Sequence, residues 1–451
     1  MNLEKIHRVY FIGIGGIGMS ALARYMQFLG KEVAGYDRTG TLITDDLIDL
    51  GIEITFKDEL DILKKDFVKK ENTLIVYTPA VKRKENKLLN YFMSNEYNVI
   101  KRAALLGIIT KNSVCLAVAG THGKTTTSSI LGHILKEAGV EATSFLGGIA
   151  ENYNSNLILG GSKYAVVEAD EFDRSFLQLE PNIACITSVD ADHLDIYNSH
   201  SDLVDTFKEF GALASEQLFV KKGLPFKATT YGVNEDADFD AHNIRIDNGV
   251  CLFDVKTPKQ VYKNIEIQLA GKHNVLNTMA ALAMANSIGV SLQDIAKALL
   301  TYKGVNRRFS YRLKSEKWIL IDDYAHHPTE INAVFDTVNE MYPKEKKLAI
   351  FQPHLYSRTR DFVSDFVKSL AQFDQIILLP IYAAREHPIN GVSSQILVEK
   401  IKKINTNVSL VKPESLFNEI LNSNTRLVIM MGAGDIGEMV TDVQEKLSQL
   451  M

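Results

Sequence analysis

The feature that most constrains the fold of this chain is a glycine-rich loop between an apolar run and a helix-forming stretch. Residues 114–118 form the apolar run, and the loop 120–125 follows with the sequence Gly-Thr-His-Gly-Lys-Thr. Behind the loop, apolar residues recur with helical spacing up to Ala138, and Gly139 ends the pattern. A strand, a glycine-rich loop and a helix in this order are typical of an α/β fold with a parallel sheet.

The same order of elements occurs at two further places. Residues 9–12 lead through the turn 13–18 into a helical stretch at 19–29, and beyond Arg308 four apolar strands are expected at 318–321, 348–351, 376–379 and 427–431. At roughly 150 residues per domain, the length of 451 predicts three α/β domains, which we place at 1–110, 111–308 and 309–451. Short alternating pieces between 218 and 269 predict a small β insertion in the central domain.

The composition of the chain limits its partners and its location. The formal net charge of −5 provides no basic surface for nucleic acid, so any bound phosphate is expected to belong to a small ligand. Three widely spaced cysteines fit buried thiols better than disulfides or a zinc site. The N-terminus has no apolar signal core, and no apolar run reaches the ~18 residues of a membrane span. We therefore expect a cytoplasmic protein that binds no membrane.

The loop after residue 118 carries the side chains that phosphate chemistry needs. Gly120 and Gly123 would open backbone N–H groups to phosphate oxygens. The ammonium of Lys124 would neutralise the outer phosphates, and the hydroxyl of Thr125 would bind a magnesium ion. The match to the pattern G-x-x-x-x-G-K-[ST] is incomplete, because Val118 stands where its first glycine belongs. The alternative is an ordinary strand–turn–helix unit with a solvated lysine.

Two acidic clusters follow the next two predicted strands. Glu168 ends one strand, and His193 lies among aspartates behind the other. A nucleoside triphosphate needs a hard cation held by oxygen ligands, typically a carboxylate at the end of a neighbouring strand. Thr125, Glu168 and His193 are therefore the predicted metal ligands. The alternative is a structural histidine among solvated acids.

A second glycine-rich turn follows the first predicted strand. Gly13, Gly15 and Gly18 have the spacing G-x-G-x-x-G, and Asp37 ends the next strand. In a dinucleotide-binding turn the glycines admit a pyrophosphate to the helix N-terminus, and the acid binds a ribose hydroxyl. NAD and a UDP-sugar both carry these groups, so the turn alone does not choose between them.

A third loop of this kind, at 432–435, has the sequence Gly-Ala-Gly-Asp and follows the last predicted strand. Its two glycines are similar to those of a nucleotide-binding turn. A helix-entry loop without a ligand explains them equally well.

Taken together, these motifs resemble those of the Mur ligases. The resemblance extends from Ile6 to Gly437 and keeps the family order. It is carried by 12–20 (Ile-Gly-Ile-Gly-Gly-Ile-Gly-Met-Ser), 120–127, 168–171 (Glu-Ala-Asp-Glu), 192–195 (Asp-His-Leu-Asp), 273–277 (His-Asn-Val-Leu-Asn), 307–309 (Arg-Arg-Phe), 322–328 (Asp-Asp-Tyr-Ala-His-His-Pro) and 352–354 (Gln-Pro-His). Within the family, the match is to members that join L-alanine to UDP-N-acetylmuramate.

The resemblance implies a three-domain Mur ligase architecture, with a Rossmann-like N-terminal domain, a central P-loop ATPase-like domain and a Rossmann-like C-terminal domain. The residues implied to bind UDP-N-acetylmuramate are Gly15, Gly16, Gly18, Met19, Ser20, Thr78 and Ala80. Those implied to bind ATP are Gly120, Thr121, His122, Gly123, Lys124, Thr125, Thr126, His273, Asn274, Asn277 and Asp323. The offset phosphate loop is the family's own form.

The resemblance also implies the chemistry. ATP with Mg²⁺ would activate the lactyl carboxylate as an acyl phosphate, and the amine of L-alanine would then form the amide of a peptidoglycan precursor. The implied catalytic residues are Lys124, Glu168, His193 and Arg307, and those implied around L-alanine are His354, Tyr356 and Arg358. Arg307 would reach the phosphates on domain closure, and His193 or His354 would take a proton from the amine.

Two other functions account for parts of the sequence. An NAD-dependent dehydrogenase would use the turn 13–18 and Asp37 but would leave Lys124 without a role. A nucleotide-dependent switch would use Lys124, but the sequence contains no Asn-Lys-x-Asp guanine signature. Ser188 and Asp190 depart from the Mur ligase pattern, in which Asn and Glu are usual, and both lie beside the expected second metal site.

Overall fold

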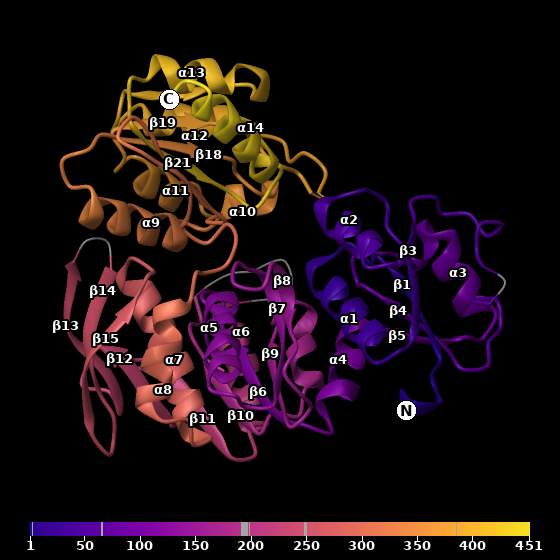
Figure 1. Ribbon diagram of the computed structural model, residues 1–451. Helices are drawn as coiled ribbons and strands as arrows, with labels where there is room; N and C mark the ends of the chain where they lie inside the picture. Colours follow the sequence, from indigo (N-terminus) through magenta and orange to yellow (C-terminus); the bar gives the residue numbers. More distant parts are fainter. Residues whose placement is uncertain (2, 65, 191–196, 198, 248–249, 385) are drawn as a thin grey trace. The chain divides into compact units, whose positions relative to one another are not determined.

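The computed structural model describes the chain except for residues 2, 65, 191–196, 198, 248, 249 and 385 and the side chain of 247. The described strands form sheets of five, ten and six strands with helices packed on them (Figure 1), as expected of an α/β protein. The chain divides into two compact units, one with 1–245, 252–268 and 276–303 and the other with 246–251, 269–275 and 304–451. None of the described helices is long and apolar enough to cross a membrane.

The first sheet has the order β3-β2-β1-β4-β5, and all its strands are parallel. Its elements are η1 (Leu3–Lys5), β1 (Arg8–Ile12), α1 (Ile17–Phe28), β2 (Glu32–Tyr36), α2 (Leu42–Asp49), β3 (Glu53–Thr55), β4 (Thr73–Tyr77), η2 (Arg83–Glu85), α3 (Lys87–Ser94), β5 (Asn98–Lys101) and α4 (Arg102–Thr110). Side chains alternate along β1, because Val9 and Phe11 pack with α1 and α4 whereas Tyr10 and Ile12 pack with α3. Accordingly, α3 and α4 cover opposite faces of this sheet (Figure 1).

The central sheet has the order β15-β14-β13-β12-β11-β10-β6-β9-β7-β8. Its elements are β6 (Val114–Ala119), α5 (Lys124–Glu137), β7 (Ala142–Ala150), β8 (Ser155–Ile158), β9 (Tyr164–Glu168), η3 (Phe172–Gln178), β10 (Ile183–Ile186), α6 (His200–Ala212), β11 (Gln217–Lys221), β12 (Thr229–Val233), β13 (Phe239–Asp247), β14 (Val250–Lys256), β15 (Val261–Ile267), α7 (Lys272–Ser287) and α8 (Leu292–Thr301). Strands β6 and β9–β13 are parallel, and β8 runs antiparallel to β7.

The β insertion expected at 218–269 is a continuation of this central sheet. Strands β11, β12 and β13 pair in parallel register beside β10, and β14 and β15 extend the edge. Alternating hydrophobicity shows that strands are present, but it does not show which neighbours they pair with. The predicted strands are therefore confirmed, and the structure adds that they extend the central sheet.

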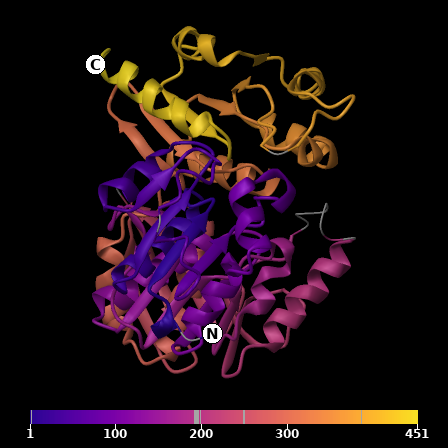
Figure 2. The ribbon, with the colours of Figure 1, turned by 90° about the vertical axis from the view of Figure 1, so that its right-hand side faces the viewer.

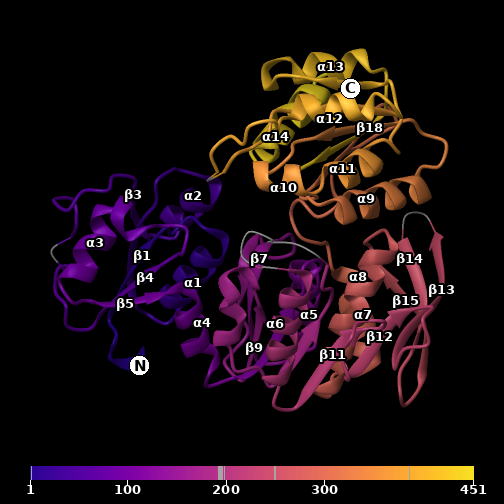
Figure 3. The same ribbon diagram turned by 180° about the vertical axis from the view of Figure 1, so that it is seen from behind.

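Helix α5, which follows the phosphate loop, is held firmly in the first unit. Its residues from Thr125 to Leu135 are all buried. His133 bonds Tyr153 through Nδ1 (2.7 Å) and the Ala298 carbonyl of α8 through Nε2 (3.0 Å). The packing of α5 beside α8 is seen from behind in Figure 3. The loop at the start of α5 therefore stands on a rigid support.

One apolar core joins the first two sheets within the first unit. Helix α1 packs against β7 and β8, and Met19, Phe145 and Leu157 belong to the same cluster of buried side chains. The N-terminal glycine turn, at the start of α1, is thereby fixed against the sheet that carries the phosphate loop.

The third sheet has the order β16-β17-β21-β18-β19-β20, with β16 antiparallel to β17 and the other pairs parallel. Its elements are β16 (Ser310–Lys314), β17 (Ile319–Asp323), α9 (Pro328–Met341), β18 (Lys347–Phe351), α10 (Tyr356–Asp361), α11 (Val363–Leu370), β19 (Gln375–Leu378), α12 (Ser394–Ile401), β20 (Val408–Leu410), η4 (Pro413–Ser415), α13 (Leu416–Asn422), β21 (Leu427–Met431) and α14 (Ile436–Ser448). Helices α9, α11 and α12 pack on one face, and α13 and α14 pack on the other. The yellow C-terminal helix in Figure 2 is α14.

Candidate functional site

The phosphate loop lies at the carboxyl end of β6, between the ends of β9 and β10. Gly120 (φ 137°) and Gly123 (φ 82°) both have backbone conformations that favour glycine. A Cβ at Gly120 would overlap the hydroxyl of Thr187, and one at Gly123 would lie 2.5 Å from Oδ1 of Asn277. Both glycines are therefore required by conformation and by space.

The residues after β10 hold this loop from one side. The hydroxyl of Thr187 donates to the carbonyls of Ala119 (3.1 Å) and His122 (2.5 Å). The hydroxyl of Ser188 accepts from the amide of His122 (2.8 Å) and bonds the hydroxyl of Thr121 (2.9 Å). Ser188, which departs from the expected family pattern, thus has a structural role in fixing the loop.

Lys124 is the first residue of α5, and its ammonium is bonded on all sides. It donates to the carbonyl of Gly120 (2.5 Å) and to Oε1 (2.9 Å) and Oε2 (2.8 Å) of Glu171. Burial alone would lower the pKa of Lys124, but attraction to Glu171, and then to Asp170 and Glu168, outweighs burial and raises it. Glu171, absent from the predicted site residues, is the direct partner of the lysine; its place in the motif 168–171 was its signal in the sequence.

Two of the predicted metal ligands face one another. The Thr125 hydroxyl donates to Oε1 of Glu168 (3.1 Å), and the amide of Gly147 donates to Oε2 (2.9 Å). The third predicted ligand, His193, lies outside the described residues. In the described part of the chain, no group of three or more His, Cys, Asp or Glu side chains has a metal-binding arrangement.

The other residues expected at the nucleotide fall into both compact units. Thr121 in the loop and Thr126 in α5 are buried, and His122 Nε2 lies 3.6 Å from Oδ2 of Asp190. In the first unit, Asn277 packs on Gly123 and accepts a hydrogen bond from Thr127 (3.4 Å).

In the second unit, Asn274 donates to the Ala270 carbonyl (2.7 Å), and His273 Nδ1 lies 3.5 Å from the Thr337 hydroxyl. ATP binding by His273, Asn274 and Asn277 stays a prediction.

The N-terminal glycine turn is shaped by its neighbours. Oδ2 of Asp37 accepts a hydrogen bond from the amide of Gly15 (2.7 Å), so in this structure Asp37 stabilises the turn. Thr78 packs directly on Gly13, and its hydroxyl accepts from the amide of Ala80 (3.4 Å). The structure therefore brings Thr78 and Ala80 beside the turn, and their binding of the UDP-sugar stays a prediction.

Two residues expected at the UDP-sugar point into the protein. The side chains of Met19 and Ser20 are buried, and the Ser20 hydroxyl donates to the carbonyl of Ile17 (2.9 Å) and accepts from the side-chain amide of Asn156 (2.8 Å). A ligand at this turn would meet backbone N–H groups of the first turn of α1, near Gly16 and Gly18, rather than these side chains.

Arg307 is held against the third sheet. Its guanidinium donates to Oδ1 of Asp322 (3.4 Å) and to the carbonyl of Gly432 (2.5 Å), and it lies 5.2 Å from the Tyr324 ring centre. The loop 432–435 leads into α14. The amide of Ile436, the first residue of α14, donates to the side-chain oxygen of Gln352 (3.1 Å). These protein contacts favour the interpretation of 432–435 as a helix-entry loop over that of a nucleotide-binding turn.

Asp323, one of the residues implied to bind ATP, is buried with both carboxylate oxygens engaged. Oδ2 accepts from the amide of Phe309 (2.7 Å), and Oδ1 accepts from that of Ala325 (2.7 Å). Burial raises the pKa of Asp323 to about 7, although the Arg308 guanidinium and the two amides act in the opposite direction. Its first role is to hold the chain around β17.

The residues expected at L-alanine follow β18 in the chain. His354 stacks on Tyr382, with ring centres 5.7 Å apart, and Nδ1 of His354 lies 3.4 Å from Nη1 of the buried Arg358. Tyr356 begins α10, the helix that also carries Arg358. The structure therefore places the three residues in one loop–helix segment.

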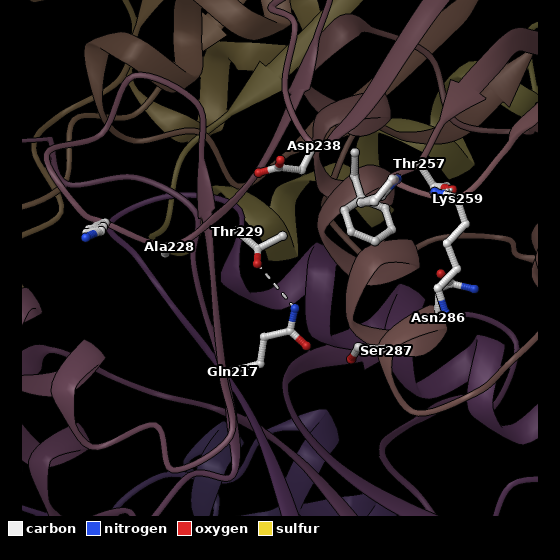
Figure 4. Close-up of a pocket in the computed structure, with 11 residues that line it drawn as sticks. Gln217, Ala228, Thr229, Asp238, Thr257, Lys259, Asn286 and Ser287 are labelled. Atoms are coloured by element: carbon white, nitrogen blue, oxygen red, sulfur yellow. Dashed lines mark hydrogen bonds between the residues drawn. The ribbon is translucent and has the colours of Figure 1, made fainter.

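A pocket of about 580 Å³ lies elsewhere in the first unit (Figure 4). It is lined by Gln217, Thr229 and Phe239, which begin β11, β12 and β13, and by Asn286 and Ser287 at the end of α7. Gln217 donates to the hydroxyl of Thr229 (3.3 Å). Because these strands are parallel to β6, the pocket is at the opposite edge of the sheet from the phosphate loop and is separate from the nucleotide site.

Comparisons with known proteins agree with this geometry. Three family models match in succession: "Mur ligase family, catalytic domain" at 8–113, "Mur ligase middle domain" at 118–285 and "Mur ligase, glutamate ligase domain" at 307–434. They confirm the predicted three-domain Mur ligase architecture, whereas the boundaries at 110 and 308 stay a prediction.

Relatives with assigned names are similar over the same length. The chain is 56% identical over 451 residues to the UDP-N-acetylmuramate–L-alanine ligase of Flavobacterium psychrophilum, with 100% of each chain covered. It is 54% identical over 449 residues to the ligase of the same name from Christiangramia forsetii, with 99% of each covered. The crystal structure of UDP-N-acetylmuramate-alanine ligase MurC from Thermotoga maritima is similar with a TM-score of 0.85 and 27% identity, covering 98% of this chain and 100% of that one. By sequence and by fold, this chain belongs to the Mur ligase family.

Proposed function

We propose that the protein is an ATP-dependent ligase that joins L-alanine to the lactyl carboxylate of UDP-N-acetylmuramate, in peptidoglycan precursor synthesis in the cytoplasm. The observation that carries the proposal is the loop 120–125, where Lys124 begins α5 and Thr125 donates to Glu168, in a chain 56% identical to a ligase of that name. The N-terminal turn would bind the pyrophosphate of the UDP-sugar, and the segment with His354 and Arg358 would receive the amino acid.

The loop also fits a magnesium ion. The hydroxyl of Thr125 and the carboxylate of Glu168 are hard oxygen ligands of the kind that Mg²⁺ binds, and their oxygens lie 3.1 Å apart. The Gly147 amide fixes the second carboxylate oxygen. A bound Mg²⁺ would neutralise charge on the nucleotide phosphates.

In the first step, an oxygen of the lactyl carboxylate attacks the γ-phosphorus of ATP. A carboxyl O–P bond forms, the bond from the γ-phosphorus to the β,γ-bridging oxygen breaks, and ADP leaves with that oxygen. The amides and Lys124 of the phosphate loop are placed to stabilise the negative charge of the transferring group. Arg307 would add a second cation after leaving Gly432.

In the second step, the neutral amine of L-alanine attacks the acyl carbon. The tetrahedral intermediate collapses, the C–O bond to phosphate breaks, and inorganic phosphate leaves. The amine nitrogen loses its proton to a base, for which His354 is the candidate among the described residues. The amide product remains attached to the UDP-sugar.

The test is ADP release with each substrate omitted in turn. Release should require both UDP-N-acetylmuramate and L-alanine, and replacing L-alanine with glycine or serine should measure amino-acid preference. In parallel, UDP-N-acetylmuramate should raise the melting temperature, because a ligand that binds the native state stabilises it. Equal ADP release without either substrate, or a thermal shift with NAD alone, would refute the proposal.

A further inference from the structure

Each carboxylate of the segment 168–171 has a different partner. Glu168 accepts from Thr125, Asp170 pairs with Arg102 (3.2 Å), and Glu171 pairs with Lys124 through both oxygens. Of these three pairs, the last occupies the ammonium that a nucleotide phosphate would need. The ion pair of Lys124 with Glu171 therefore lies on the binding path of the nucleotide.

The contacts of Lys124 match its full set of donors. An ammonium has three N–H groups. Lys124 directs its ammonium to the Gly120 carbonyl and to the two oxygens of Glu171, at 2.5, 2.9 and 2.8 Å. A phosphate oxygen can receive an N–H of Lys124 only if one of these acceptors gives it up or shares it. Because the Gly120 carbonyl belongs to the backbone of the loop, the Glu171 carboxylate is the acceptor that can yield.

The backbone of Glu171 is held by two hydrogen bonds, and its side chain is buried. The Glu171 carbonyl accepts from the hydroxyl of Tyr197 (2.6 Å) and from the amide of Arg174 (2.9 Å). The residue is 1% exposed, so its charge is shielded from water and Lys124 compensates it. The exchange with a phosphate needs only the side chain of Glu171 to turn away from Lys124, whereas its carbonyl can keep both hydrogen bonds.

We propose that Glu171 is a positioning residue that competes with the outer phosphates of the nucleotide for the ammonium of Lys124. This inference rests on the proposed function, since it assumes that ATP binds the loop 120–125. The exchange replaces one ion pair with another and makes or breaks no covalent bond. By recapturing Lys124, Glu171 lowers the affinity for ATP and ADP and assists the release of ADP after turnover.

The test is the Glu171→Gln variant, which keeps the shape of the side chain and removes the competing charge. By calorimetric titration, ATP should bind this variant about tenfold more tightly than it binds the wild-type protein, the factor of one charge-assisted hydrogen bond. AMP lacks the outer phosphates, so its affinity should be unchanged. ADP dissociation, measured by stopped flow, should slow by a similar factor. A role in folding alone would not distinguish ATP from AMP.

Asp173→Asn is the matched control. Asp173 lies two residues after Glu171, is half exposed and pairs with Lys101 at 3.2 Å. The substitution removes the same charge, and Asn readily adopts the left-handed conformation found at Asp173 (φ 54°). Because Asp173 is paired with a different lysine in a solvent-exposed setting, its loss should change ATP affinity by less than about twofold.

Glu171→Asp provides a second test of ATP affinity that does not depend on the folding of Glu171→Gln. It keeps the charge but shortens the side chain by one carbon, so competition should weaken and ATP should bind about threefold more tightly, between the wild type and Glu171→Gln. Equal or weaker ATP binding in a folded Glu171→Gln or Glu171→Asp variant overturns the inference while the proposed function stands. Failure of the wild-type protein to bind ATP overturns both.

Discussion

The amide of Gly147 donates a hydrogen bond to Oε2 of Glu168, with the two atoms 2.9 Å apart. A side chain at 147 would overlap this carboxylate, so the absence of a Cβ allows β7 to approach the end of β9. The other oxygen of Glu168 then points to the hydroxyl of Thr125. The orientation of a predicted metal ligand therefore depends on a glycine that no phosphate-binding pattern includes.

Gly147→Ala should displace Glu168. We expect turnover to fall at least tenfold and the free energy of unfolding to decrease by about 1–3 kcal/mol, the usual effect of an overpacked site. Initial rates of ADP release and urea unfolding measure the two effects. Gly40→Ala is the control, because a Cβ there meets the ring of Phe56 at an ordinary 3.8 Å. Normal turnover by Gly147→Ala would show that the orientation of Glu168 is unimportant.

Arg307→Ala should lower kcat by about a thousandfold, the lower end of the range for arginines that stabilise a transferring phosphoryl group. The melting temperature of the Arg307→Ala variant should change little, because Asp322 keeps Arg312 as a partner at 2.9 Å. Arg312→Ala, in contrast, should destabilise the protein by about 1–3 kcal/mol while reducing kcat far less. A comparison of kcat and melting temperature for both variants checks this. Equal kcat values in the two variants would contradict the role of Arg307.

The stability of the protein should depend on the ionisation of Asp323. Burial raises its pKa to about 7 in the folded protein, whereas in the unfolded chain it titrates near 3.9. Between about pH 4 and 7 the folded protein thus retains a proton that the unfolded chain has lost. The stabilisation from Asp323 is fully present below about pH 4 and is lost as pH rises to about 7, by up to about 1.4 kcal/mol per pH unit.

Urea unfolding at several pH values would measure this contribution. The decline between about pH 4 and 7 should be weaker in Asp323→Asn, whose amide does not titrate in this range. Parallel pH profiles for the two proteins would mean that Asp323 is ionised in the folded state. The substitution also alters two backbone hydrogen bonds, so the slope and not the absolute stability is the diagnostic quantity.

An acyl-phosphate route should transfer oxygen from substrate to phosphate. If the lactyl carboxylate carries heavy oxygen, one labelled atom should appear in inorganic phosphate after turnover with L-alanine. The reason is that Lys124 and Thr125 are arranged for the outer phosphates, so attack is expected at the γ-phosphorus. Mass analysis of the products gives the answer. Labelled AMP, or unlabelled phosphate, would indicate a different activation step.

The elements around the phosphate loop could be predicted from sequence because they depend on local patterns. The strand β6, the glycines at 120 and 123 and the helix α5 follow from hydrophobic spacing and backbone conformation, although the burial of α5 on all sides from Thr125 to Leu135 does not. The same holds for Lys124 and Thr125, whose positions are fixed by the start of the helix. Local rules also located β9 and the acidic residues behind it.

The contacts among the acids could not be predicted, because they depend on side-chain direction at the end of a strand. Three carboxylates lie within four residues, yet in the structure Lys124 pairs with Glu171, and the Thr125 hydroxyl donates to Glu168. Asp37 shows the same limit, since its position fits a ribose contact but its carboxylate bonds the amide of Gly15. Strand pairing beyond β10 is likewise a long-range property that a one-sided hydrophobic pattern leaves open.

The hydrogen bonds between Thr187 or Ser188 and residues 119–122 have a consequence for the rates of amide exchange and of nucleotide association. Since the amides of Thr121 and His122 are bonded to Ser188, their protons should exchange slowly with solvent before any nucleotide is added. The conformational entropy of the loop is then lost during folding and not on binding. Nucleotide association should accordingly need no ordering of the loop backbone, and substitutions at Ser188 should slow it although that residue is 68 positions from Gly120 in the chain.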